Sequence, residues 1–237
     1  MYINIITIMN ITTLEWLPSD VYNHFDIELA DLSSLTTTNK NIREFIRNSS
    51  IKINHVITYS SRLKTWVRFL SNVTLNNENL EDIHLFSNVH TLDLSHTNVV
   101  DVLNLGGVHT LNLMNTLVVD VSALSSVHTL NLSHTYIVDF SCLVGVYNLN
   151  LRSNNIVDVS MLGSVHTLNL SDTKVVDVSM LSKVFSLNLR STNVADVSAL
   201  GRVHTLNLSG TKVVDVSTVE SVHTLNILYT NVVNIEP

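Results

Sequence analysis

Apolar and polar residues repeat along the second half of the chain with a constant period. Counting from a valine as the first place of a unit, leucine recurs at the fourth place, leucine or isoleucine at the sixth, and valine or isoleucine at the eleventh. Around Leu92 and Leu94 the alternation has a period of two, which predicts a strand with leucine inward and polar side chains outward. Successive units start 19 residues apart without an insertion, at Val89, Val108, Val127, Val146, Val165, Val184, Val203 and Val222.

The repeat predicts a solenoid with one parallel sheet, because a single unit cannot bury its leucine face alone whereas stacked units share a core. Residues 70–237 resemble leucine-rich repeats, with residues 70–88 as a divergent first unit, so we expect the array to begin near Leu70. A unit of 19 residues leaves too little chain for a helix on the return path. The return segment is rich in β-branched residues and is expected to run extended, which gives a solenoid of gentle curvature.

Three polar columns are assigned to structure rather than to chemistry. Threonine or asparagine at the ninth place is expected to pair backbone groups of the neighbouring coil, and aspartate at the thirteenth place to cap the turn after it. A calcium track along these aspartates is the alternative, but the repeat lacks the glycine turns that such coils need. Histidine at the second place is replaced by Tyr147 and Phe185 in two units, which indicates packing rather than a zinc site. We expect no metal, no cofactor and no catalytic residue.

The outward positions of the strands are expected to form a concave partner-binding face, where repeat solenoids usually bind. Most of this face is Thr, Asn and Ser, and two departures, Arg152 and Arg190, are placed to clamp an acidic group unless they are simply solvated. Valine at the twelfth place is either a contact strip or a result of β-propensity. The predicted partner-binding residues are Asp93, Asn112, Met114, Asn131, Asn150, Arg152, Asn169, Asn188, Arg190, Asn207 and Leu228.

Residues 17–46 have a different pattern, which predicts three short helices. The segment resembles an F-box in its Leu-Pro start, its later Asp-Leu pair, and a Lys and an Arg around an apolar residue. It departs from that family by a shorter gap between Leu-Pro and Asp-Leu and by Thr37 and Thr38, where apolar residues are usual. The match is carried by Leu17, Pro18, Asp20, Val21, Phe25, Asp31, Leu32, Leu35, Lys40, Ile42 and Arg43.

The F-box resemblance and the repeat together predict an α+β chain: an F-box-like helical segment at 1–47, a connector and helical cap at 48–69, and a parallel-β solenoid at 70–237. This layout is that of substrate receptors in SCF-type ubiquitin ligases, and the uniform repeats also resemble proteins of giant DNA viruses of amoebae. It implies a noncatalytic adaptor that binds a Skp-type adaptor and a protein substrate. The alternative is a freestanding scaffold whose N-terminus only caps the solenoid, together with a helix at 61–70. The implied adaptor contacts are Leu17, Pro18, Val21, Phe25, Leu32, Leu35 and Ile42.

Composition narrows the class of protein further. The net charge is -7 and no Lys/Arg cluster is present, which argues against nucleic acid as a partner. No apolar run approaches the roughly 20 residues of a membrane-spanning helix. The single cysteine, Cys142, and a first segment without the features of a signal peptide predict an intracellular, cytoplasmic protein, of a host cell if viral.

The last unit ends at Pro237 without the polar cap that terminal repeats normally need. We expect this coil to fray or to be covered by a partner or a second copy. Self-association through the C-terminal coil is therefore one of the expected interactions.

Overall fold

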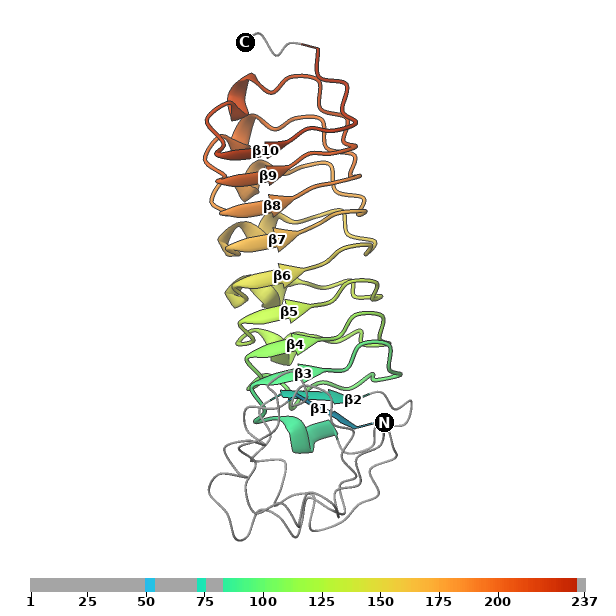
Figure 1. Cartoon of the computed structure of the whole chain (residues 1–237). Helices are drawn as coiled ribbons and strands as arrows, with labels where there is room; N and C mark the ends of the chain where they lie inside the picture. Colours follow the sequence, from blue (N-terminus) through green and yellow to red (C-terminus); the bar gives the residue numbers. More distant parts are fainter. Residues whose placement is uncertain (1–49, 54–71, 76–82, 234–237) are drawn as a thin grey trace, which may run out of the picture.

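The computed structural model describes residues 50–53, 72–75 and 83–233. Their strands form one parallel sheet in the order of the chain, and Figure 1 shows the coils stacked as a nearly straight column. The predicted parallel-β solenoid is confirmed. The strands are β1 (Ser50–Ile53), β2 (Asn72–Leu75), β3 (Thr91–Asp93), β4 (Thr110–Asn112), β5 (Thr129–Asn131), β6 (Asn148–Asn150), β7 (Thr167–Asn169), β8 (Ser186–Asn188), β9 (Thr205–Asn207) and β10 (Thr224–Asn226).

The register of the sheet reproduces the sequence period. From β2 onwards, each strand residue lies beside the residue 19 positions later, so that Leu111 has Leu92 on one side and Leu130 on the other. Equivalent places of successive units therefore stand in columns along the stack. A substitution at one place changes one position in one column and leaves the others unchanged.

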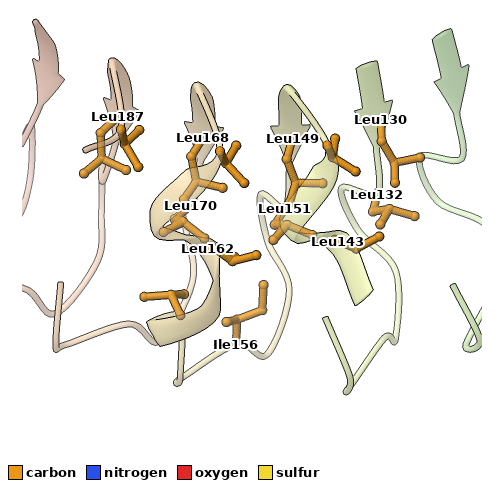
Figure 2. Close-up of a cluster of buried hydrophobic side chains, with 14 of the residues drawn as sticks. Leu130, Leu132, Leu143, Leu149, Leu151, Ile156, Leu162, Leu168, Leu170 and Leu187 are labelled. Carbon is orange, nitrogen blue, oxygen red and sulfur yellow. The ribbon is translucent and has the colours of Figure 1, made fainter. Parts of the chain in front are cut away.

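Columns of aliphatic side chains form a continuous core inside the stack (Figure 2). Two columns come from the strand side, at the fourth and sixth places, as in Leu149 and Leu151. Two others come from the return path, where Ile156 occupies the eleventh place and Leu162 the seventeenth. All four side chains are buried, and each lies beside its equivalents in the coils above and below. One coil alone would expose most of this surface, so the repetition is what makes the fold stable.

In the coils that start at Val108 to Val203 the return path closes with a short 3₁₀ helix, which corrects the expectation that it has no room for a helix. A 3₁₀ helix has only three residues per turn and fits where an α-helix does not. The segment before it is extended but unpaired as a strand, with single bonds between coils such as Lys174 N–H to the Ile156 carbonyl, 3.1 Å. In the described part of the chain, no helix is long and apolar enough to cross a bilayer. The 3₁₀ helices are η2 (Ile83–Phe86), η3 (Ser122–Leu124), η4 (Ser141–Gly145), η5 (Ser160–Ser164), η6 (Ser179–Leu181), η7 (Ser198–Leu200) and η8 (Ser217–Val219).

The sheet begins earlier than Leu70, where the sequence analysis placed the first coil. Strand β1 pairs with β2 so that Ser50 lies beside Asn72, a step of 72 − 50 = 22 residues rather than 19. A search at a fixed period misses this strand for that reason. The F-box-like segment at 1–47 and the helix at 61–70 lie outside the described residues, so both stay predictions.

Strand β10 forms the other edge of the sheet. Leu225 and Ile227 are only half-buried, whereas their counterparts Leu206 and Leu208 in the preceding coil are fully buried. The last described coil thus shows apolar surface along the stack axis. Its covering by a partner or a second copy stays a prediction.

Candidate interaction surface

The sheet face, made by the third, fifth and seventh places, brings the predicted partner-binding residues together on neighbouring strands. The fifth place is a column of half-buried asparagines that starts with Asp93. The seventh place carries the departures from the regular pattern. Met114 is half-buried there, and Arg152, Arg190 and Leu228 are exposed. Any partner on this face would meet a polar lattice interrupted by a few larger side chains.

The asparagine column is tied into the turns that follow the strands, a role that the sequence analysis missed. Oδ1 of Asn112 accepts a hydrogen bond from Met114 N–H at 3.2 Å, and Oδ1 of Asn150 accepts from Arg152 N–H at 3.1 Å. In such a turn the side-chain oxygen accepts a hydrogen bond from the backbone N–H two residues later, so this oxygen stabilises the fold. The Asn131 amide NH₂ is also engaged, because it donates to Oδ1 of Asn112 in the preceding coil at 2.9 Å. The same turn contact of Oδ1 recurs at Asp93, Asn131, Asn169, Asn188, Asn207 and Asn226.

The two arginines of the predicted clamp differ in their surroundings. Arg152 Nε donates to Asp172 Oδ2 at 2.9 Å, and both side chains are partly exposed. Within residues 83–233 no carboxylate forms a salt bridge with Arg190. An exposed ion pair is worth only about 0–1 kcal/mol, so an acidic partner can displace Asp172 at little cost. Arg152 can bind an acidic partner group only when Asp172 moves away from it, and the sequence does not indicate this requirement.

A second exposed surface lies on the return side of each coil. The twelfth place points outward in every coil, so this column is an exposed strip rather than part of the core. Leu117 and Tyr136, at the tenth place, are also exposed. We call the tenth, twelfth and thirteenth places together the valine flank. The strip consists of Val100, Val119, Val138, Val157, Val176, Ala195, Val214 and Val233.

The aspartates of the valine flank cap the turn that follows each of them, as predicted, and from Asp120 onwards this turn leads into a 3₁₀ helix. Oδ1 of Asp120 accepts from Ser122 N–H at 2.9 Å, and the same bond recurs in each coil from Asp101 to Asp215. The hydrogen bonds from the backbone N–H and the hydroxyl of Ser122 lower the pKa of Asp120, although slight desolvation and the charge of Asp139 oppose them. The lowered pKa keeps the Asp120 carboxylate charged at neutral pH.

The ninth-place column works within each coil rather than between coils, which corrects the expectation from sequence. The hydroxyl of Thr97 donates to the carbonyl of Leu94 in the same coil at 2.6 Å, and the other threonines repeat this bond. Asn154 is the exception. Its amide donates to the Leu132 carbonyl of the preceding coil at 2.8 Å, and its Oδ1 accepts from Thr135 N–H at 3.0 Å.

The second-place rings form a continuous column of ring contacts, some stacked and some edge-to-face, which confirms a packing column. The ring centroids of His90 and His109 lie 4.5 Å apart and those of His109 and His128 4.6 Å apart, and the column continues through Tyr147 to His223. Partial burial, followed by the charges of His90 and His128, lowers the pKa of His109. Among the described residues, no group of three or more His, Cys, Asp or Glu side chains is placed to hold a metal ion.

Acid should destabilise the fold in two stages. Below the ordinary histidine pKa of 6.5, the unfolded chain takes up a proton that His109 resists in the fold, so stability declines as the pH falls. The turn aspartates contribute stability above their ordinary pKa of 3.8, and this is lost as the pH falls towards their lower folded values.

Urea unfolding followed by circular dichroism at pH 7.5, 5.5 and 3 measures both stages. His109→Phe should weaken the first stage and leave the second intact, because Phe185 already occupies this column. A midpoint that rises between pH 7.5 and 5.5 would contradict the account.

The comparisons with known proteins establish the fold. No protein-family model and no curated protein sequence matches the chain. An internalin of Listeria monocytogenes superposes with a TM-score of 0.61 at 18% identity, over 86% of this chain and 76% of the internalin. Internalin C2 of the same organism gives 0.56 at 23% identity, over 69% of this chain and 83% of its own.

A leucine-rich-repeat protein of Leptospira interrogans gives a TM-score of 0.65 at 17% identity, over 90% of this chain and 62% of its own length. These identities are too low to carry a function across. The superpositions agree with the parallel strands and the 19-residue columns described above. The chain thus has the leucine-rich-repeat fold that its sequence pattern predicts.

Proposed function

We propose that the chain is a noncatalytic protein-binding module. The supporting observation is that the repeated polar side chains stabilise the fold, whereas most of the larger irregular side chains are exposed. The repeated Asn, Thr and Asp side chains are bonded into their own turns. The larger departures from the repeat, apart from the half-buried Met114, are exposed on the surface of a continuous solenoid. A stiff lattice with a few exposed, distinctive side chains is suited to holding a partner.

The sheet face is the proposed site of capture. Arg152 follows strand β6 and Arg190 follows strand β8. Both occupy the seventh place, two coils or roughly 10 Å apart. One acidic group of the partner would replace Asp172 at Arg152, and a neighbouring acidic group of the partner would reach Arg190. Met114 and Leu228 offer apolar contacts in the same column, closer to the two ends of the array.

The finer form of the proposal is a substrate receptor of an SCF-type ubiquitin ligase. It rests on the F-box resemblance of residues 17–46, with Leu17, Pro18 and Leu32 as central adaptor contacts. A freestanding scaffold with a helical N-terminal cap is equally compatible with the leucine-rich-repeat fold. The two differ in whether the N-terminal segment binds a Skp-type adaptor.

A pull-down of the full chain with a purified Skp-type adaptor tests the finer proposal. Replacing Leu17 and Pro18 with alanine, or Leu32 with aspartate, should abolish adaptor binding, because these changes remove the apolar contact surface. The circular dichroism of the solenoid should stay unchanged. Arg152→Ala with Arg190→Ala is the matched control and should leave adaptor binding intact.

The result also separates the alternatives. If the intact chain binds no Skp-type adaptor, and deletion of residues 1–46 unfolds the solenoid, the freestanding scaffold replaces the receptor. If a substrate is captured equally well by the wild-type chain and by the double arginine variant, the sheet face is not the site of capture.

A further inference from the structure

The valine flank is most apolar in the two coils that start at Val108 and Val127. Leu117, Val119, Tyr136 and Val138 are 49%, 54%, 72% and 88% exposed. The core does not need them, because the intervening Val118 and Ile137 point inward and are buried. At the tenth place the other regular coils carry asparagine or lysine, so Leu117 and Tyr136 are departures from the repeat. These four side chains form an apolar patch that the fold leaves uncovered.

A row of negative charge runs along one side of this patch. Asp120 and Asp139 directly follow Val119 and Val138, and Asp101 and Asp158 continue the row in the adjoining coils. All four are exposed, and each uses Oδ1 to cap its own turn. In residues 83–233 no lysine or arginine forms a salt bridge with any of them. The row is therefore an uncompensated acidic edge beside an apolar strip.

The spacing of the coils discriminates between the kinds of chain that fit this surface. Neighbouring strands stand about 4.8 Å apart, so each column offers a side chain at about that interval. An α-helix lying along the stack presents one side chain per turn at about 5.4 Å, a mismatch of only about 0.6 Å per coil. An extended strand repeats its side chains on one face at about 6.7 Å and falls out of register within two coils. A helix therefore matches the columns over the four coils from Asp101 to Asp158.

We propose that the valine flank binds a basic amphipathic helix of a partner protein, lying along the stack. Its apolar stripe covers Leu117, Val119, Tyr136 and Val138, and lysines or arginines beside that stripe face Asp120 and Asp139. A second copy of this chain fits less well, because a symmetric contact would bring the aspartate rows towards one another. The described residues also include no basic amphipathic helix that a second copy would supply.

This surface is separate from the sheet face and from the N-terminal segment. The sheet face uses the third, fifth and seventh places, whereas the flank uses the tenth, twelfth and thirteenth. Loss of adaptor or substrate binding would not affect the flank, and a failure of the flank proposal would leave the proposed function standing. The two are distinguishable in the same preparation of the full chain.

Fluorescence anisotropy with a designed peptide tests the proposal. The probe is an 18-residue helix-forming peptide with a leucine stripe beside a lysine stripe, titrated with the full chain. Val119→Ser with Val138→Ser should weaken binding about tenfold or more, since these residues lie at the centre of the contact. Asp120→Asn with Asp139→Asn should weaken it about fivefold and reduce its dependence on salt. Asparagine keeps the oxygen that caps the turn, so this variant should fold normally.

Matched control variants test where along the valine flank the peptide binds. Asp196→Asn with Asp215→Asn makes the same change of charge farther along the row and should weaken binding less than twofold. Three outcomes would overturn the proposal: equal binding of a scrambled peptide of the same composition, equal effects of the two aspartate pairs, or no effect of the valine variant. Sedimentation of the chain alone tests whether a second copy of the chain occupies the valine flank. A dimer that dissociates on Val119→Ser with Val138→Ser would assign the flank to a second copy and overturn the helix.

Discussion

Replacing Leu149 with alanine should lower the free energy of unfolding by about 3–4 kcal/mol. The side chain is buried and stands between Leu130 and Leu168 in the middle of the core (Figure 2). Truncation of a buried leucine typically costs about 2–5 kcal/mol through lost burial and the cavity left behind. The coils above and below are bonded to the same strand, so they have little freedom to collapse into that cavity.

Urea denaturation followed by circular dichroism measures the change. Val138→Ala is the matched control, because it removes aliphatic atoms from an exposed position of the same solenoid and should cost less than about 0.5 kcal/mol. Each coil contacts only its neighbours, so a weakened centre should also make the transition broader. A loss below about 1 kcal/mol at Leu149 would show that the coils do not share a packed core.

Replacing Asn154 with alanine should cost about 3 kcal/mol, nearly as much as the leucine. The buried amide donates to the carbonyls of Leu132 and Leu151 at 2.8 and 3.0 Å, and Oδ1 accepts from the N–H of Thr135 at 3.0 Å. Alanine leaves Thr135 N–H and the Leu151 carbonyl without these partners. A buried polar group left unsatisfied costs about 1–3 kcal/mol.

Asn154→Thr provides the sharper comparison. Threonine occupies this place in the other regular coils and donates to the leucine carbonyl three residues earlier, so the Leu151 carbonyl regains its partner. Only the bonds to the preceding coil are lost, and the cost should fall to about 1 kcal/mol. Equal losses for the alanine and threonine variants, measured by the same urea titration, would show that the hydrogen bonds of Asn154 do not carry its contribution.

Features that depend on the period could be predicted from the sequence. The leucine columns, the aspartate turns and the stacked rings follow from residue types that return at one place in successive units. Repetition removes the ambiguity that a single leucine or aspartate would leave, because eight copies must satisfy the same geometry. The outward valine strip was left undecided by sequence, since exposure depends on how the return segment turns.

Other features are not predicted from the sequence, because the repeated property is a backbone conformation rather than a residue type. The eighth place adopts a left-handed backbone in every coil, with φ from 54° at Asn115 to 70° at Gly210. Its occupants share no chemistry, but most are His, Asn, Asp or Gly, which tolerate positive φ. That tolerance is the signal in the sequence, and three residues depart from it: Ser153 and Ser191, each with φ 57°, and Tyr229, with φ 60°.

The candidate site was harder to predict than the fold for a related reason. The fifth-place asparagines were assigned to partner binding because they point outward, yet their oxygens hold the turns. Direction alone does not tell whether a polar atom is free. The pairing of Arg152 with Asp172 joins two residues 20 positions apart in neighbouring coils, and neither belongs to a repeated column of its kind.

Residue-resolved hydrogen exchange on the full chain tests most directly the central claim, that 19-residue coils stack into one column bonded strand to strand. Amides at the sixth and eighth places donate to the next coil, as Leu132 does to the Asn150 carbonyl at 2.8 Å and His134 to that of Arg152 at 3.0 Å. Val138 N–H, at the twelfth place, has no backbone acceptor in the described part of the chain. The account predicts slow exchange at the sixth and eighth places of each middle coil and fast exchange at the twelfth, repeating every 19 residues. Protection without that period, or exchange at Val138 as slow as at Leu132, would contradict it.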